Sequence, residues 1–264
     1  VMVLAATAWM LSAAYVTLHK RHIGITVFYI MASDKGKWWL DLFAYVIGVI
    51  ALGLLIDDSV IRALESVIMV ERAGSAWNSP QPLILKSMLT LGAIVYILQL
   101  MINLYRHFSS KLAKNIVLII CGLILLRITC VIIVHFVGEE SFFGYINSIY
   151  AYVGSFINPQ EIINMRDMDI GTASLLIVAL MLVLMMTGMP LGVVTLFVSI
   201  LSALFYFGYG GLYLVSTNAF GLLEKYPLIA VPLFVLMASI LERAGVAEDL
   251  FDAMSIFAGK LRGG

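Results

Sequence analysis

The sequence predicts an all-α integral membrane protein with about seven transmembrane or re-entrant helices, together with amphipathic helices at the membrane interface. Apolar residues make up 62% of the chain and charged residues 12%, whereas soluble domains have about 45–50% and about 25%. The apolar residues fall into long runs, and most charged residues lie in the polar segments between them. This is the distribution that a chain embedded in lipid requires.

The apolar runs are residues 1–18, 40–56, 82–104, 115–137, 172–187, 190–207 and 226–241. Most approach the roughly 20 residues needed to cross a bilayer. The run 40–56 and the last three are shorter, so tilting, bilayer thinning or a re-entrant path remains open for them. No run has the form of a removable signal peptide, and Val1 already lies within an apolar run, so we expect the natural chain to begin further upstream.

The placement of basic residues predicts the topology. If the loop after residue 18 is cytoplasmic, ten of the sixteen Lys and Arg residues lie inside, four lie outside, and Lys86 and Arg127 lie within runs. The ten are Lys20, Arg21, Lys35, Lys37, Arg106, Lys111, Lys114, Arg243, Lys260 and Arg262. An excess of basic residues on the cytoplasmic side favours this orientation.

Arg127 lies near the middle of its run, where a charged side chain is costly and marks a functional candidate. No acidic residue lies deep within any run. We therefore favour pairing of Arg127 with backbone carbonyls, polar groups of an adjoining span or lipid phosphate, with a role in transport as the alternative. Lys86 lies near the outer end of its run, where its side chain can reach the interface.

The cysteines and histidines do not point to a metal or disulfide site. Cys121 and Cys130 lie about 13 Å apart along one predicted helix and cannot bridge each other. The histidines are spread over both predicted faces of the membrane: His19, His22, His107 and His135. We interpret His19 and His22 as interfacial cations beside the neighbouring basic residues.

Three polar segments carry weaker patterns. Apolar residues at helical spacing within 145–156 predict an interfacial amphipathic helix or an aromatic belt. Trp38 and Trp39 predict an interfacial contact on the inner face. After Gly245 the pattern predicts a surface helix, with a lever between moving parts as the alternative. Its apolar stripe is Val246, Leu250, Met254 and Phe257, its acids are Glu248, Asp249 and Asp252, and Lys260 follows.

Residues 186–264 therefore predict a membrane span, an interrupted span and a surface helix. Pro232 lies inside the second apolar run, where it removes a backbone donor and frees a carbonyl that lipid cannot satisfy. Interrupted spans occur at the working centre of secondary transporters. Proline is also common in ordinary membrane helices, so this residue alone leaves both interpretations open.

The order of these segments resembles the tripartite ATP-independent periplasmic (TRAP) transporters. MTGMPLG, YPLIAVPLFVLMASILERAGVAEDLF and GKLRGG resemble the start of the large membrane subunit, DctM. KRHIGITVFY and SPQPLILKSMLTLGAIVYILQLMINLYR resemble the small membrane subunit, DctQ. The chain thus divides into a small part (1–110, without the first span of that subunit), a linking span and connector (111–170) and the beginning of a large part (171–264).

The resemblance implies a sodium-driven carrier in the bacterial inner membrane that takes up an organic acid from a periplasmic substrate-binding protein. It uses no ATP, and the large part moves substrate like an elevator against a fixed small part. Gly188 and Pro190 would form a tight cytoplasmic turn, and Pro232 would let its span bend. Together with Gly245 and Arg127, they are the structural or conformational candidates.

By the same resemblance, the binding sites for substrate and sodium are expected beyond Gly264, and no other cofactor is implied. Residues 57–81, 139–170 and 208–225 would face the receptor or form solvated loops. A membrane scaffold without transport activity is the main alternative, and a permease served by a separate ATPase is a lesser one. The sequence contains no HExxH, GxSxG or GxxxxGK[ST] motif, which argues against an enzyme.

Overall fold

We analysed a computed structural model of the chain, which describes residues 2–19, 22–74, 78–137, 148, 159–162, 164–223 and 225–258. Every regular element in these residues is helical. The α-helices are α1 (Met2–Leu18), α2 (Val27–Met31), α3 (Asp34–Ile68), α4 (Gln81–His107), α5 (Lys111–Val137), α7 (Pro159–Ile162), α8 (Ile170–Met186), α9 (Leu191–Phe207), α10 (Gly211–Leu223), α11 (Tyr226–Arg243) and α12 (Val246–Ala258). The short 3-10 helices are η1 (Met165–Asp167) and η2 (Gly208–Gly210).

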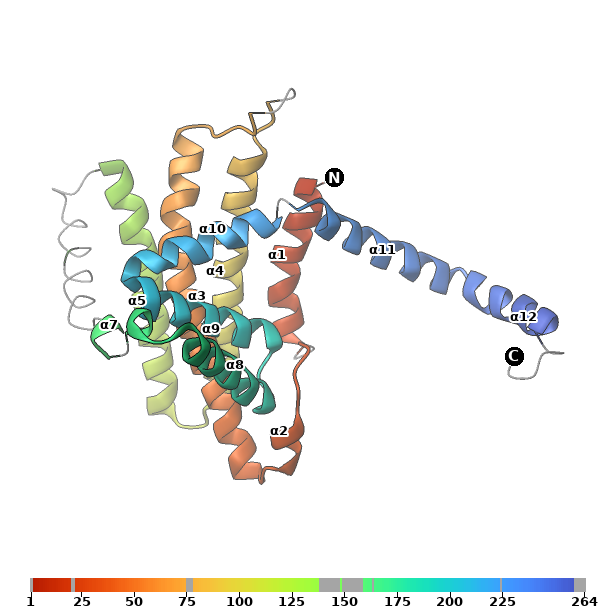
Figure 1. The fold of residues 1–264 in the computed structure, drawn as a ribbon, viewed down its shortest axis with the longest axis horizontal. Helices are drawn as coiled ribbons and strands as arrows, with labels where there is room; N and C mark the ends of the chain where they lie inside the picture. The colour runs from red at the N-terminus through yellow and green to blue at the C-terminus, as the bar shows by residue number, and fades with distance from the viewer. Residues whose placement is uncertain are drawn as a thin grey trace.

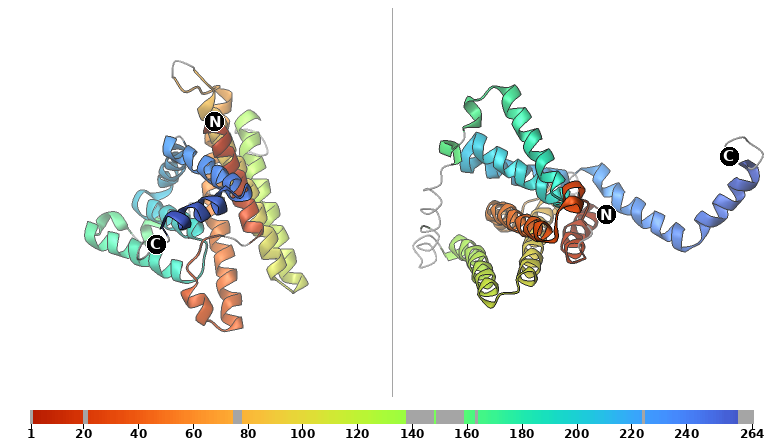
Figure 2. Two further views of the ribbon diagram at one scale, coloured as in Figure 1. Left: turned by 90° about the vertical axis from the view of Figure 1, so that its right-hand side faces the viewer. Right: turned by 90° about the horizontal axis from the view of Figure 1, so that it is seen from below.

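The helices form an upright group and a crossing group (Figure 1). Helices α1, α3, α4 and α5 stand side by side, whereas α8, α9 and α10 lie across them. Seen from below in Figure 2, the crossing helices occupy one side of the upright ones. Helix α3 is the central element, because it packs against α4, α5, α9 and α10. Helices α11 and α12 project away from this body.

Among the described residues, α3, α4, α5 and the continuous stretch Leu191–Leu223 are long and apolar enough to cross a membrane, and α1 and α8 are shorter apolar helices. This confirms the predicted fold class. Successive upright helices run in opposite directions (Figure 1), so the beginning of α3 and the end of α4 lie together, with the ring centroids of Trp38 and His107 4.8 Å apart. This alternating direction of the helices agrees with the topology that we assumed when counting the basic residues on each side of the membrane.

Helix α3 is longer than the apolar run 40–56 predicts. It begins at Asp34, where the Ser33 hydroxyl accepts a hydrogen bond from the Gly36 amide, and it continues to Ile68. Its 35 residues span about 52 Å, compared with about 30 Å for the hydrocarbon core. Asp57 and Asp58, taken as the start of an outer loop, therefore lie within the helix. Hydrophobicity alone placed the end of the helix too early, because it takes no account of the arginines that pair with both carboxylates.

Residues 208–225 were expected to be a loop but are mostly helical. Gly208, with φ +67°, ends α9, and α10 follows after a single 3-10 turn. A built Cβ on Gly211 would lie 2.4 Å from the Ala203 carbonyl oxygen, so only glycine permits this close return of the chain. The bend places α10 against α3 rather than in solvent.

Of the two interpretations left open for Pro232, the structure shows the uninterrupted helix, because α11 runs unbroken from Tyr226 to Arg243. Proline removes only one of the helical hydrogen bonds, and the turns on either side continue the helix. Gly245, with φ +74°, separates α11 from α12, and α12 begins where the acidic and apolar pattern predicted a helix. The predicted helix 145–156 and residues Lys260 and Arg262 lie outside the described residues.

Candidate functional site at the junction of the two parts

The turn between α8 and α9 binds directly to the small part. Gly188 adopts φ +85° and Pro190 precedes the first residue of α9, which is the tight turn that the sequence predicted. The Leu191 amide donates a hydrogen bond of 2.8 Å to the carbonyl oxygen of Ile23 in the loop between α1 and α2. The turn is therefore attached to the small part through its backbone.

Glycines on both sides permit this close approach. A built Cβ on Gly188 would lie 3.0 Å from Tyr29 Cβ, and a Cβ on Gly24 would lie 3.0 Å from the Met189 carbonyl oxygen. Met189 is almost fully buried in the contact. The chain from α1 to α2 and the turn from α8 to α9 thus pack backbone against backbone.

An apolar cluster continues the junction along α3. Its buried members are Ile47, Leu184, Met189, Val193, Val194 and Val198, drawn from α3, α8, the turn and α9. In lipid, helices associate mainly through close packing, because lipid tails are as apolar as the side chains. The cluster therefore depends on the fit between these helices more than on removal of apolar surface from water.

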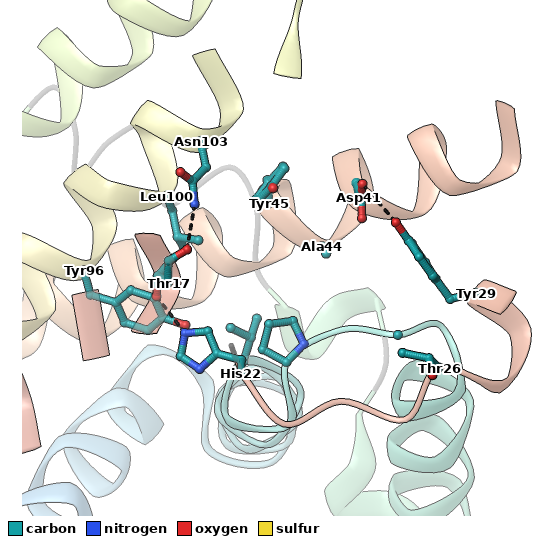
Figure 3. A pocket seen from close by; sticks show the side chains of 13 residues that line it. Thr17, His22, Thr26, Tyr29, Asp41, Ala44, Tyr45, Tyr96, Leu100 and Asn103 are labelled. Carbon is teal, nitrogen blue, oxygen red and sulfur yellow. Dashed lines mark hydrogen bonds between the residues drawn. The ribbon is translucent and has the colours of Figure 1, made fainter. Parts of the chain in front are cut away.

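A cavity of about 210 Å³, with several polar side chains in its lining, lies beside the turn, between the small and large parts (Figure 3). Its lining comprises Thr17, His22, Thr26, Tyr29, Asp41, Ala44, Tyr45, Tyr96, Leu100, Asn103, Gly188, Pro190 and Val193. The Tyr29 hydroxyl donates to Asp41 Oδ2 at 3.4 Å, and the Asn103 amide donates to the Thr17 carbonyl oxygen at 3.2 Å. The cavity therefore brings α1, α2, α3 and α4 together with Gly188 and Pro190.

His22 lines this cavity as a hydrogen-bonded, partly buried side chain. The Thr17 hydroxyl donates to the Ala13 carbonyl oxygen at 2.7 Å and also shares a hydrogen bond of 2.7 Å with His22 Nε2. The imidazole also lies near the Tyr96 ring, with centroids 5.8 Å apart. Burial lowers the pKa of His22 below its ordinary value of 6.5, which favours the neutral ring. This partly buried, hydrogen-bonded environment differs from that of the interfacial cation expected for His22.

This burial predicts a pH dependence of the junction. Because the pKa is lower in the fold than in the unfolded chain, the unfolded chain binds more protons between the two values. Stability is thus expected to fall as the pH drops below 6.5 towards the lowered pKa of His22, and this loss is absent at higher pH. Thermal unfolding in detergent from about pH 7.5 to about pH 5 measures the effect.

Exchange of His22 for glutamine should flatten the dependence, because an amide can still donate to Thr17 but does not titrate in this range. His135→Gln is the matched control, since His135 lies on α5 away from the cavity lining. Equal profiles for the wild type and His22→Gln would refute the assignment.

Arg127 has an acidic partner that the sequence did not reveal. Its Nε lies 3.2 Å from Asp57 Oδ1, which joins the linking helix α5 to α3. We expected carbonyl, polar or lipid partners because Asp57 was placed outside the membrane span. The extension of α3 beyond residue 56 brings the carboxylate within reach. The expectation of a polar partner on an adjoining span is met by this carboxylate of α3.

The remaining candidate residues lie away from the junction, and other residues that line it were not predicted. Pro232 and Gly245 lie on the projecting α11–α12 segment, away from the junction. Trp38, predicted to lie at the membrane interface, stacks on His107 and contacts Phe108. Tyr96, Asn103 and Asp41 also line the junction but were not singled out from the sequence. The pair Gln99 and Asn103, four residues apart in an apolar run and hydrogen-bonded at 3.0 Å, offered the one visible signal.

The long apolar helices define a multi-pass α-helical membrane protein, and comparison with known proteins identifies its family. The family described as "Tripartite ATP-independent periplasmic transporters, DctQ component" matches residues 1–110. The one described as "Tripartite ATP-independent periplasmic transporter, DctM component" matches residues 178–264. The chain belongs to this transporter family, combines sequence of both membrane components, and is a multi-pass protein of the bacterial inner membrane.

One curated relative supports the second match. The C4-dicarboxylate TRAP transporter large permease protein DctM of Rhodobacter capsulatus is 30% identical over 92 residues, which cover 35% of this chain and 21% of the relative. The chain therefore spans about a fifth of the length of that relative. No solved structure matches significantly.

Proposed function

We propose that this chain forms the membrane part of a sodium-driven carrier that takes up an organic acid from a periplasmic substrate-binding protein. The main support is that sequences of both membrane components of one transporter family pack into a single body through the junction. The relative named a C4-dicarboxylate permease favours a dicarboxylate as substrate. The absence of a phosphate-binding loop from the sequence is consistent with transport that does not use ATP on this chain.

In this proposal α1–α5 and α8–α10 form the fixed scaffold of an elevator. The turn at Gly188 is attached to the small part by a backbone hydrogen bond, and α8 and α9 share an apolar cluster with α3. Helix α11, by contrast, leaves the body with Phe234 and Val235 about 60% exposed. This arrangement suits a connection from the scaffold to a moving unit, with the substrate and sodium sites beyond Gly264.

Uptake in proteoliposomes tests the proposal. The full-length protein would be reconstituted, supplied with its receptor and a radiolabelled C4-dicarboxylate, and exposed to an inward sodium gradient. We expect accumulation with sodium but not with an equal potassium gradient, and no requirement for ATP. Uptake that needs ATP would favour a permease served by an ATPase. Absence of uptake with every organic acid tested would favour the scaffold alternative.

A further inference from the structure

A charged cluster on α3 faces the large part at some distance from the cavity. Arg62 binds Asp58, four residues earlier, with Nε 2.6 Å from Oδ2 and Nη2 3.2 Å from Oδ1. Both side chains are only about one-fifth exposed. A bidentate pair of this kind has a fixed geometry, so α3 presents the guanidinium in a defined orientation.

Helix α10 supplies two groups that fit this pair. Arg62 Nε also donates to the hydroxyl of Ser216 at 3.1 Å, and the same hydroxyl donates to Asp58 Oδ2. The Arg62 Cζ lies 3.8 Å from the centroid of the Tyr213 ring, within range of a cation–π interaction. Tyr213 and Ser216 are three residues apart and therefore share one face of α10. Ser216 is fully buried by the contact.

These contacts can specify register where the apolar contacts cannot. Lipid tails are as apolar as aliphatic side chains, so burying aliphatic surface does not by itself favour one register of two helices over another. The neighbouring α3–α10 contacts are of this aliphatic kind, as in the cluster that includes Ala51 and Val215. The Ser216 hydroxyl and the Tyr213 ring can both contact the fixed Arg62 guanidinium at only one register of the two helices.

We propose that Asp58 and Arg62 form the site by which the small part recognises its large part. The group recognised is an α-helix that presents an aromatic ring and, three residues later, a small hydroxyl residue. This assignment goes beyond transport, because it states what a small part requires of the helix that it accepts. It does not depend on sodium coupling or on the identity of the substrate.

The test uses the full-length chain with Cys121→Ser and Cys130→Ser and a reporter cysteine, Val215→Cys, on α10. Maleimide labelling in detergent measures how often α10 leaves α3. The decisive variant combines Asp58→Arg with Arg62→Asp, which keeps an ion pair within α3 but places a carboxylate against the Tyr213 ring. Tyr213→Leu removes the ring, whereas Tyr213→Phe keeps it. Lys114→Leu is the control, because it removes a different cation–π contact, with Tyr105 on α4, that does not involve α10.

We expect the charge exchange and Tyr213→Leu each to raise the labelling rate about tenfold. Each removes one contact that holds α10 against α3, so α10 should leave α3 more often. Tyr213→Phe and Lys114→Leu should label like the parent, and all variants should elute as single species in size-exclusion chromatography. Labelling of the charge-exchange variant at the parent rate would overturn the proposal, because the pair would then matter only within α3. Equal rates for Tyr213→Leu and Tyr213→Phe would overturn it as well.

Discussion

Replacing Arg127 with leucine is expected to destabilise the protein markedly, because the Asp57 carboxylate then loses the guanidinium 3.2 Å away. An ionised group without its partner in a membrane protein costs about 2–3 kcal/mol. For a chain of this size, that corresponds to a fall of roughly 5–10 °C in the midpoint of thermal unfolding. The midpoint can be measured in detergent by intrinsic fluorescence.

A double variant separates the ion pair from the loss of side-chain packing. Asp57→Asn combined with Arg127→Leu leaves no charge unpaired, so its midpoint should return most of the way to the wild-type value. If the fall in the midpoint for the double variant instead equals the sum of the falls for the two single variants, the ion pair contributes little and another interaction of Arg127 dominates.

Replacing Gly188 with valine is expected to detach the turn from the small part. A β-branched residue at φ +85° is strained, and its Cβ would lie 3.0 Å from Tyr29 Cβ. Together these effects should cost about 2–4 kcal/mol and lower the unfolding midpoint by roughly 5–15 °C. Because the turn carries the hydrogen bond from Leu191 to Ile23, we also expect faster proteolysis of the loop between α1 and α2.

Gly192→Ala provides the matched control, four residues further along the chain. A Cβ at Gly192 meets open space and the residue is in α9, so alanine should leave the midpoint unchanged or raise it slightly. A similar fall for both variants would show that the turn has no special need for glycine.

The sequence predicted the membrane class and most helices, because each depends on local information, and the family resemblance implied the tight turn. Apolar runs determine where helices lie in lipid, and the MTGMPLG segment contains the glycine and proline that a tight turn needs. The ends of α3 and the whole of α10 were missed. Asp57 and Asp58 interrupt the hydrophobicity of α3, yet their partners are 70 and 4 residues away.

The junction could be predicted only in part, since it depends on contacts between distant segments. Gly188 and Pro190 were recognised as a turn, but nothing in their own sequence shows that Ile23 would accept the hydrogen bond from Leu191. His22 was assigned to the interface because basic residues precede it. Its actual surroundings come from α1 and α4, which the fold brings together.

The most direct test of a fixed scaffold is uptake by the full-length protein after the junction has been locked. Cysteines replace Ile23 and Leu191, whose backbones are hydrogen-bonded, and serines replace Cys121 and Cys130. A short bismaleimide then links the two positions, with each single-cysteine variant treated in the same way as a control. If the small part and α8–α10 form one body throughout transport, sodium-driven uptake of the organic acid will continue in the linked protein. Loss of uptake in the linked protein alone would show that the junction must open during transport and would contradict the fixed scaffold.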